Sequence, residues 1–145
     1  MQKRHKNYLG LPGWFFGGRY SVERYAYTLH RITGLAVLTY FIMHIFVTGS
    51  RAGGPEQWER TMALFHHPLF KIGEFMVFLA VIYHAANGIR LILVELANFV
   101  GKPGLPSYPY SNSTVRQRPL LIAVMAVAAI IMIFGGIDFY YLLLK

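Results

Sequence analysis

Cysteine is absent from the 145 residues, and charged residues make up only 14% of them. Without cysteine the chain has no disulfide framework, no thiol nucleophile, no cysteine zinc site and no cysteine ligands for an iron–sulfur cluster. Soluble domains carry about 25% charged residues, so the low charge excludes an ordinary soluble domain. A hydrophobic content of 55% also excludes a disordered chain. With a mean hydropathy of +0.41, the composition indicates a single integral membrane domain over 1–145.

Three stretches with little or no charge are long enough to cross a bilayer as helices. Nineteen uncharged residues lie between Arg31 and Arg51, and eighteen more begin at Leu120. The middle stretch has fifteen uncharged residues before Arg90, and its apolar pattern then resumes. We predict an all-α membrane protein with three transmembrane helices over about 24–49, 70–100 and 119–143, preceded by an interfacial tail over 1–23.

Arg90 and Glu95 are the two charges within the middle stretch. They lie five residues apart, about 140° around a helix, so they do not simply neutralise each other. Because a charge facing lipid is costly, both side chains are expected to face protein, water or a polar ligand.

The 14 Lys and Arg residues are divided unevenly between the two sides of the predicted spans. Ten lie in residues 1–31 or near the loop over 101–118, whereas four lie in the loop between the first two helices or at the C-terminus. This bias places the N-terminus in the cytoplasm and the chain in the cell (inner) membrane. The net charge of +8 is therefore a topology feature, and no basic surface for nucleic acid is visible.

Two of the six histidines lie inside the apolar stretches. His5, His66 and His67 are interpreted as solvated or interfacial loop residues, whereas His44 and His84 are embedded among apolar residues. An ionisable residue in a span is a functional candidate by default. Each of these two is either a neutral histidine hydrogen-bonded to a neighbouring helix or an axial ligand of haem iron.

The spacing of the residues around His84 does not by itself decide between a hydrogen-bonded histidine and a haem ligand. Gly88 and Ala80 lie one turn on either side of it, and small residues there would let a flat macrocycle lie against the helix. Small residues at this spacing are equally common in helix packing.

His44 and His84 are predicted at different depths in the membrane. Each lies about 20 Å along its own helix, but the two helices run in opposite directions, so the depths differ by about 10–15 Å. The two histidines cannot readily bind one iron. They could each provide one ligand to two stacked haems, with the opposite ligands coming from another polypeptide.

His30 and Arg31 stand at the cytoplasmic boundary of the first span, and His30 lies on broadly the same helix face as His44. A His-Arg pair there offers hydrogen-bond donors to anionic propionates or to a quinone carbonyl. The alternative is a pair of positive anchors at the membrane surface.

The segments TLHRITG and YHAANGIRLILVE, over about residues 20–100, resemble the cytochrome b membrane-anchor subunit of succinate dehydrogenase. That family has an HR(I/V)(S/T)G motif opening its first helix and a (Y/F)H-x-x-x-GIR motif in its second. The resemblance implies that His84 is a haem b axial ligand and that His30 and Arg31 lie near the haem propionates and the quinone. His44 resembles the extra ligand of two-haem members.

Some members of that family have a serine at the quinone site where this chain has Tyr27, so Tyr27, Thr28 and Tyr83 are further candidates for the quinone pocket. Gly88 is a candidate for packing against the haem. The resemblance also implies three partners: a flavoprotein subunit, an iron–sulfur subunit and a second membrane-anchor subunit that completes a haem-binding bundle. Electrons from succinate would then reach a quinone near the cytoplasmic surface.

Three other functions compete with this one. Fumarate reductase has a similar anchor and catalyses the reverse reaction. A b-type cytochrome could serve another oxidoreductase, or the chain could be a haem-free structural anchor whose histidines make hydrogen bonds between helices. A transporter is disfavoured, because so short a chain has no broken-helix pair or inverted repeat.

Overall fold

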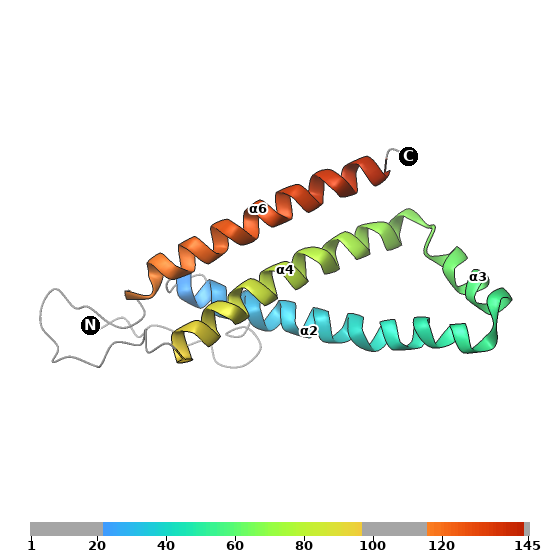
Figure 1. Cartoon of the computed structure of the whole chain (residues 1–145), viewed down its shortest axis with the longest axis horizontal. Helices are drawn as coiled ribbons and strands as arrows, with labels where there is room; N and C mark the ends of the chain where they lie inside the picture. Colours follow the sequence, from blue (N-terminus) through green and yellow to red (C-terminus); the bar gives the residue numbers. More distant parts are fainter. Residues whose placement is uncertain (1–21, 97–115, 144–145) are drawn as a thin grey trace, which may run out of the picture.

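A computed structural model describes residues 22–96 and 116–143, and the regular elements in these residues are all helical. Three of these helices are long, and Figure 1 shows a short helix that joins two of them at one end of the molecule. In chain order they are α2 (Val22–Gly49), η1 (Ser50–Gly53), α3 (Pro55–Leu64), α4 (Pro68–Leu96) and α6 (Arg118–Leu143). The helices α2, α4 and α6 are long and apolar enough to cross a membrane, which confirms the predicted fold class.

The helix boundaries follow local sequence. Pro55 and Pro68 begin α3 and α4, and Pro119 is the second residue of α6; proline suits the first turn, where its missing N–H is not needed. Gly54 precedes α3 with a φ of 92°, a conformation that favours glycine. The predicted spans differ from the observed helices by at most two residues at the described ends, which is within the usual uncertainty. Most of the predicted tail, His5 and residues 97–100 lie outside the described residues.

The connection between the first two spans is more ordered than the loop we expected. It contains η1 and the ten-residue helix α3. The guanidinium of Arg51 lies 4.5 Å from the ring centroid of Trp58, and Arg60 donates a 2.7 Å hydrogen bond to Glu56 one turn away. These local contacts support a short helix that buries no side chain.

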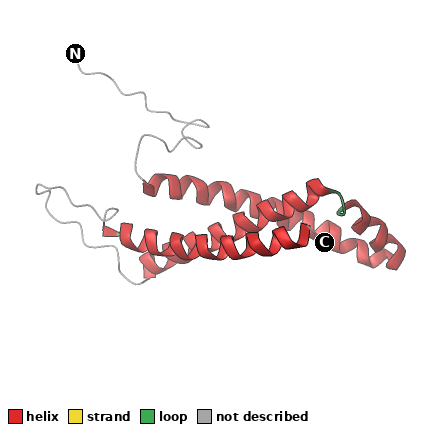
Figure 2. Cartoon of the chain, turned by 90° about the horizontal axis from the view of Figure 1, so that it is seen from above, coloured by secondary structure: helices red, strands yellow, loops and turns green. Residues whose placement is uncertain are grey.

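The helix α4 is the central helix and packs against both α2 and α6. In Figures 1 and 2 the start of α2, the end of α4 and the start of α6 lie at the same end of the molecule. We call this the basic end, because Arg24, Arg116 and Arg118 lie there. The opposite end, which carries α3, is called the α3 end. From the basic end α2 and α4 diverge, and α3 spans the gap between them (Figure 1).

Aromatic rings on α4 pack against two glycines of α6. Phe75 stacks on Phe139 with ring centroids 4.9 Å apart, and its ring lies beside Gly136. A Cβ added to Gly135 would overlap the ring of Phe78. Glycines thus let the two helices approach closely, as small residues commonly do in membranes.

An ion pair joins α2 to α6 at the basic end. Arg118 donates from Nε to Glu23 at 2.7 Å and from Nη2 at 3.4 Å. The Glu23 side chain is 12% exposed, whereas that of Arg118 is 43% exposed. The pair therefore connects two helices that begin side by side although they are distant in sequence.

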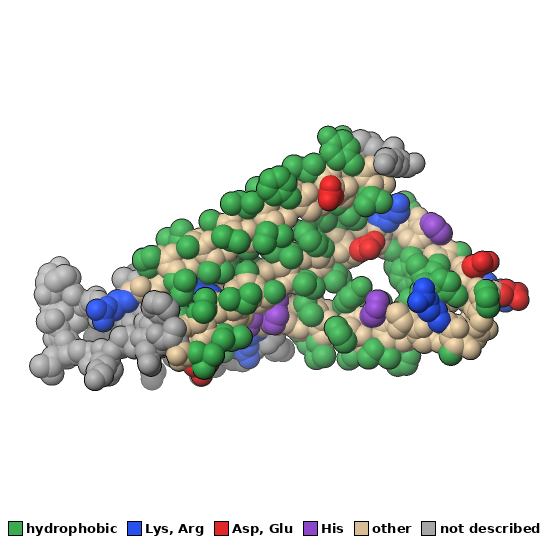
Figure 3. All heavy atoms as spheres, viewed as in Figure 1, with side chains coloured by type: hydrophobic (Ala, Val, Ile, Leu, Met, Phe, Trp, Pro, Cys, Tyr) green, Lys and Arg blue, Asp and Glu red, His purple; other side chains and the backbone are tan. Residues whose placement is uncertain are grey.

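Many large hydrophobic side chains are exposed on the surface of the described helices, whereas half of the few buried residues are polar or charged. Figure 3 shows hydrophobic side chains along the long helices, with charged ones mostly toward the two ends. Nearly every residue of α2 from Leu35 to Phe46 is exposed. Among the described residues, four apolar and four polar or charged ones are buried: Ala26, Val94, Leu121, Ala128, Thr28, Thr33, Asn87 and Arg90. This distribution fits a chain whose solvent is hydrocarbon rather than water.

The contact between α4 and α6 predicts a specific cost for enlarging Gly135. Gly135→Leu should destabilise the protein by about 1–3 kcal/mol, the range for overpacking a close contact. The matched control is Gly73→Leu on α4, because a Cβ at Gly73 meets nothing within 4 Å. Unfolding of both variants in detergent, followed by circular dichroism, measures the difference. Equal stability of the two variants would contradict the close packing of Phe78 on Gly135.

Candidate functional site

Two stacked imidazole rings join α2 to α4 in the half of the molecule nearer the basic end. The rings of His30 and His84 have centroids 4.1 Å apart and an interplanar angle of 3°. Both residues are conspicuous in the sequence, which gives no reason for them to meet. The structure brings His30, one member of the predicted boundary pair, together with His84, the predicted intramembrane ligand.

The orientation of the His84 ring follows from its hydrogen bonds. Nδ1 lies 3.1 Å from the backbone carbonyl oxygen of His30 and 3.5 Å from Oγ1 of Thr33. A carbonyl oxygen only accepts, so Nδ1 of His84 must carry the proton. Nε2 is then the unprotonated nitrogen with a lone pair in the ring plane, and none of the described residues hydrogen-bonds to it.

Two neighbouring residues on α2 shape the space for this ring. A Cβ on Gly34 would lie 2.8 Å from Cε1 of His84, closer than side-chain atoms normally approach. Thr33 turns its hydroxyl back to the carbonyls of Leu29 and His30. Sequence reasoning missed Thr33 and Gly34 as site residues. Their positions three and four residues after His30 could have indicated them, because those positions share one helix face.

Gly88 contacts the same stack from α4. A Cβ there would lie 3.7 Å from Cε1 of His30, an ordinary van der Waals distance. The backbone of Gly88 therefore lies beside the His30 ring. Its predicted packing against a haem remains a prediction.

A buried polar pair lies on α4, on the basic-end side of His84. Asn87 is 0% exposed and Arg90 is 6% exposed, and Nε of Arg90 donates to Oδ1 of Asn87 at 2.9 Å. Among the described residues, no carboxylate lies within ion-pair distance of Arg90. Arg90 thus faces protein, as expected for a charge in a span, and forms no ion pair with Glu95. Asn87 was missed, although an amide one turn from His84 in an apolar segment was the available indication.

Two buried nitrogen atoms near the stack lack hydrogen-bond partners within residues 22–96 and 116–143. They are Nδ1 of His30 and Nδ2 of Asn87. A buried polar atom without a partner is costly and often indicates a missing ligand, water or ion. The site therefore has capacity for further hydrogen bonds.

The predicted quinone residues fall on different faces of α2. Arg31 lies 5.3 Å over the ring of Tyr27, and both residues are exposed. Thr28 is buried, and Tyr83 from α4 donates its hydroxyl proton to the carbonyl oxygen of Ala26 at 3.0 Å. The structure brings Tyr27 and Arg31 together and separates them from Thr28 and Tyr83.

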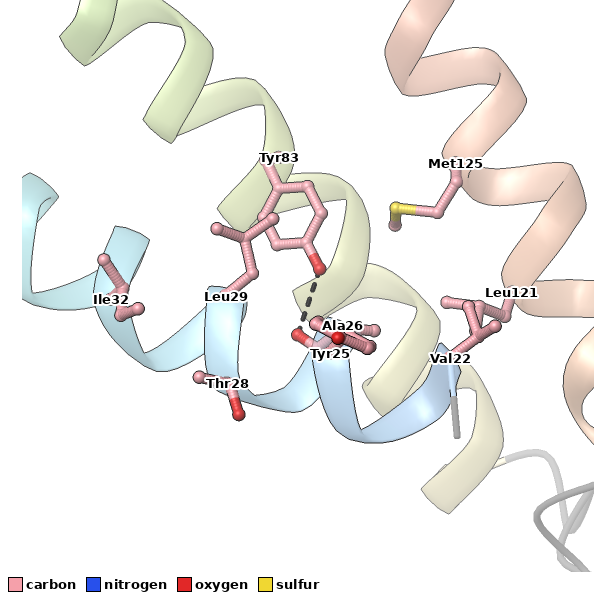
Figure 4. Close-up of a pocket in the computed structure, with 9 residues that line it drawn as sticks. All are labelled: Val22, Tyr25, Ala26, Thr28, Leu29, Ile32, Tyr83, Leu121 and Met125. Atoms are coloured by element: carbon pink, nitrogen blue, oxygen red, sulfur yellow. Dashed lines mark hydrogen bonds between the residues drawn. The ribbon is translucent and has the colours of Figure 1, made fainter. Parts of the chain in front are cut away.

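Thr28 and Tyr83 line a cavity of about 340 Å³ between α2, α4 and α6. In Figure 4 the side chains of Leu29, Tyr83 and Met125 point toward one another across it. The full lining is apolar apart from hydroxyl groups: Val22, Tyr25, Ala26, Thr28, Leu29, Ile32, Tyr83, Leu121 and Met125.

His44 lies apart from the stacked pair. It is exposed on the half of α2 nearer the α3 end, and its Nδ1 is 3.5 Å from the hydroxyl of Tyr40. Fourteen residues of helix separate it from His30, which corresponds to about 21 Å along the axis. His44 and His84 are thus well separated. Among the described residues, no three His, Asp or Glu side chains gather as a metal site, so His66 and His67 have no further ligands nearby.

These observations define the class of protein: a three-span membrane subunit with an oriented histidine at a helix interface. The chain belongs to the family of succinate dehydrogenase/fumarate reductase transmembrane subunits, which its residues 16–135 match. It is also similar to the succinate dehydrogenase 2 membrane subunit SdhC of Mycobacterium tuberculosis. The two are 23% identical over 113 residues, covering 78% of this chain and 74% of that protein.

The close approach of Gly34 to His84 yields a prediction. Gly34→Ala should displace the ring and weaken the bond from Nδ1 to the His30 carbonyl, a loss of about 1 kcal/mol. Gly49→Ala on the same helix is the control, since a Cβ there meets nothing within 4 Å. Nitrogen-15 NMR of histidine-labelled protein should show His84 protonated at Nδ1 in the parent and in Gly49→Ala, with a shifted signal in Gly34→Ala. A parent His84 protonated at Nε2 would contradict the assigned tautomer.

Proposed function

We propose that this chain is the membrane-anchor cytochrome b subunit of a succinate:quinone oxidoreductase. In this proposal it binds haem b through His84 and contributes Arg31 to the quinone site. The observation that supports it most directly is the hydrogen bond from Nδ1 of His84 to the His30 carbonyl. Histidines that ligate metals commonly donate their other ring N–H to a carbonyl in this way, which fixes the tautomer and the ring orientation.

The residues present fit a haem. Nε2 of His84 has no hydrogen-bond partner among the described residues, and the His30 ring stacks on a face of the imidazole rather than against this nitrogen. The buried Nδ1 of His30 lacks a partner among the described residues, so it can serve a polar group of the ligand such as a propionate. Because the ring of His30 lies parallel to that of His84, it cannot be the opposing ligand. That ligand is assigned to a second membrane-anchor subunit.

Bound haem supplies a one-electron carrier in the membrane. The chain's own part is to hold its imidazole in one tautomer, to surround it with the α2 backbone and to keep water away. The sequence has no cysteine to hold an iron–sulfur cluster and no nucleotide-binding motif for a flavin, so both groups are assigned to separate subunits. We therefore assign a flavoprotein and an iron–sulfur subunit as partners on the cytoplasmic side, the side that the excess of Lys and Arg assigns to the N-terminus and the basic end.

Arg31 and Tyr27 are proposed for the quinone. Both are exposed on the face of α2 away from the cavity, where a second subunit and a quinone can reach them. The guanidinium of Arg31 can donate to a quinone carbonyl oxygen. Thr28 and Tyr83 are weaker candidates, because Thr28 is buried and the Tyr83 hydroxyl already bonds Ala26.

A second haem at His44 is the other candidate for this chain. The exposed, apolar half of α2 that carries His44 offers room for a cofactor and a partner helix. The distance of about 21 Å along α2 from His30 excludes a single iron shared with His84. Electrons could then cross the membrane through two haems. A fumarate reductase anchor or a haem-free anchor remain the alternative functions.

Counting haem in the purified complex tests the ligand assignments. We expect two haems b per complex in the parent, by pyridine haemochrome assay. His84→Ala should lose the inner haem and weaken assembly, and His44→Ala should lose only the outer one. One haem in the parent complex would mean that His44 packs against a helix and does not bind haem. Full haem content in the assembled His84→Ala complex would refute the ligand, and none in the parent would leave a haem-free anchor.

The quinone assignment predicts a split between two activities. Arg31→Ala should lower succinate:quinone reductase activity by about tenfold or more, the effect of losing a charge-assisted hydrogen bond. Succinate oxidation with a soluble dye should stay unchanged, because the dye accepts electrons before they reach the membrane. Arg24→Ala, about two turns nearer the start of the same helix, is the control. Equal loss of both activities in Arg31→Ala would argue for a structural role.

A further inference from the structure

The cavity between α2, α4 and α6 is separate from the proposed quinone site. Leu29 lines it, while Arg31 does not. These two residues differ by about 200° around α2, so Arg31 and the cavity lie on different faces of the helix. The cavity needs an occupant of its own.

The lining selects an apolar chain. Leu29, Leu121 and Met125 present hydrocarbon or thioether surface, and they converge with the ring of Tyr83 in Figure 4. The Tyr83 hydroxyl already donates to the carbonyl oxygen of Ala26. An occupant with polar groups at this depth would leave them without partners, at considerable cost.

The basic-end rim of the cavity carries two arginines, Arg116 and Arg118, and one carboxylate, Glu23, so its net charge is positive. Arg118 lies one turn before Leu121 on the same face of α6. It contacts Glu23 through Nε and Nη2, yet its side chain remains 43% exposed. Arg116 is exposed nearby. An anionic group above an apolar chain would complement both the rim and the lining.

We propose that this cavity binds one phospholipid, with an acyl chain between Leu29, Tyr83 and Met125 and its phosphate at Arg118. The lipid fills the space where α2 and α6 diverge below their ion pair and thereby completes the packing of the three helices. The inference requires membership of the membrane-subunit family but neither the haem nor the quinone assignment.

The experiment uses the intact detergent-purified complex, delipidated and then incubated with phosphatidylglycerol, with bound lipid counted by native mass spectrometry. Met125→Trp fills the cavity and should lower retention about tenfold. Ile122→Trp is the matched control, because Ile122 is 60% exposed on the same helix. The parent and the control should each retain one phospholipid that survives washing.

Substitutions at Arg118 provide an independent test of phosphate binding. Arg118→Gln should lower retention more than Arg116→Gln does, and Arg118→Lys should preserve it. Equal retention in Met125→Trp and Ile122→Trp would overturn the proposal. So would loss of a copurified quinone, rather than phospholipid, from Met125→Trp, which would assign the cavity to an isoprenoid tail. Haem content and dye-linked succinate oxidation, measured on the same samples, report separately on the proposed function.

Discussion

A lipid bilayer offers no hydrogen bonds, and this constraint decides how the three helices pack. Each polar group inside the unit has to bond within the chain, to a partner subunit or to a bound ligand. The Nδ1–H of His84 donates a hydrogen bond to the carbonyl oxygen of His30, and the hydroxyl of Tyr83 donates one to the carbonyl oxygen of Ala26. Both bonds run from α4 to the first turns of α2, so they fix the position and the rotation of one helix against the other. The interior is consequently polar where α2 meets α4 and apolar where α4 meets α6.

The spans and the intramembrane histidines were predictable because they depend on local sequence. Long stretches with little or no charge indicate membrane-crossing helices from local sequence alone, and His84 is conspicuous in such a stretch. The helix α3 was not predictable by the same means. Its ten residues are amphipathic and too short to span, and they form a helix through contacts such as that between Arg51 and Trp58. Hydropathy averaged over the length of a transmembrane helix does not detect such local contacts.

The site was only partly predictable, because its members come from two helices. The sequence identifies His30, Arg31 and His84, but not the stacking of two imidazoles or the need for Gly34 where they meet. The list of quinone candidates had a related weakness. Tyr27 and Thr28 are adjacent in sequence, yet each residue turns the helix by about 100°. Only the packing of α4 and α6 around α2 shows that one faces outward and the other faces the cavity.

The His84 ring is held mainly by backbone, and this has a consequence for how the site withstands mutation. The carbonyl oxygen of His30 has two lone pairs. One is used by the N–H of Gly34 four residues on, as in any α-helix. The hydroxyl of Thr33 and Nδ1 of His84 also lie within hydrogen-bond distance of this carbonyl oxygen. A side chain can be exchanged without moving this acceptor, whereas enlarging Gly34 acts on the ring directly. The orientation of His84 therefore depends less on the imidazole of His30 than on a regular α2 helix and an empty position at Gly34.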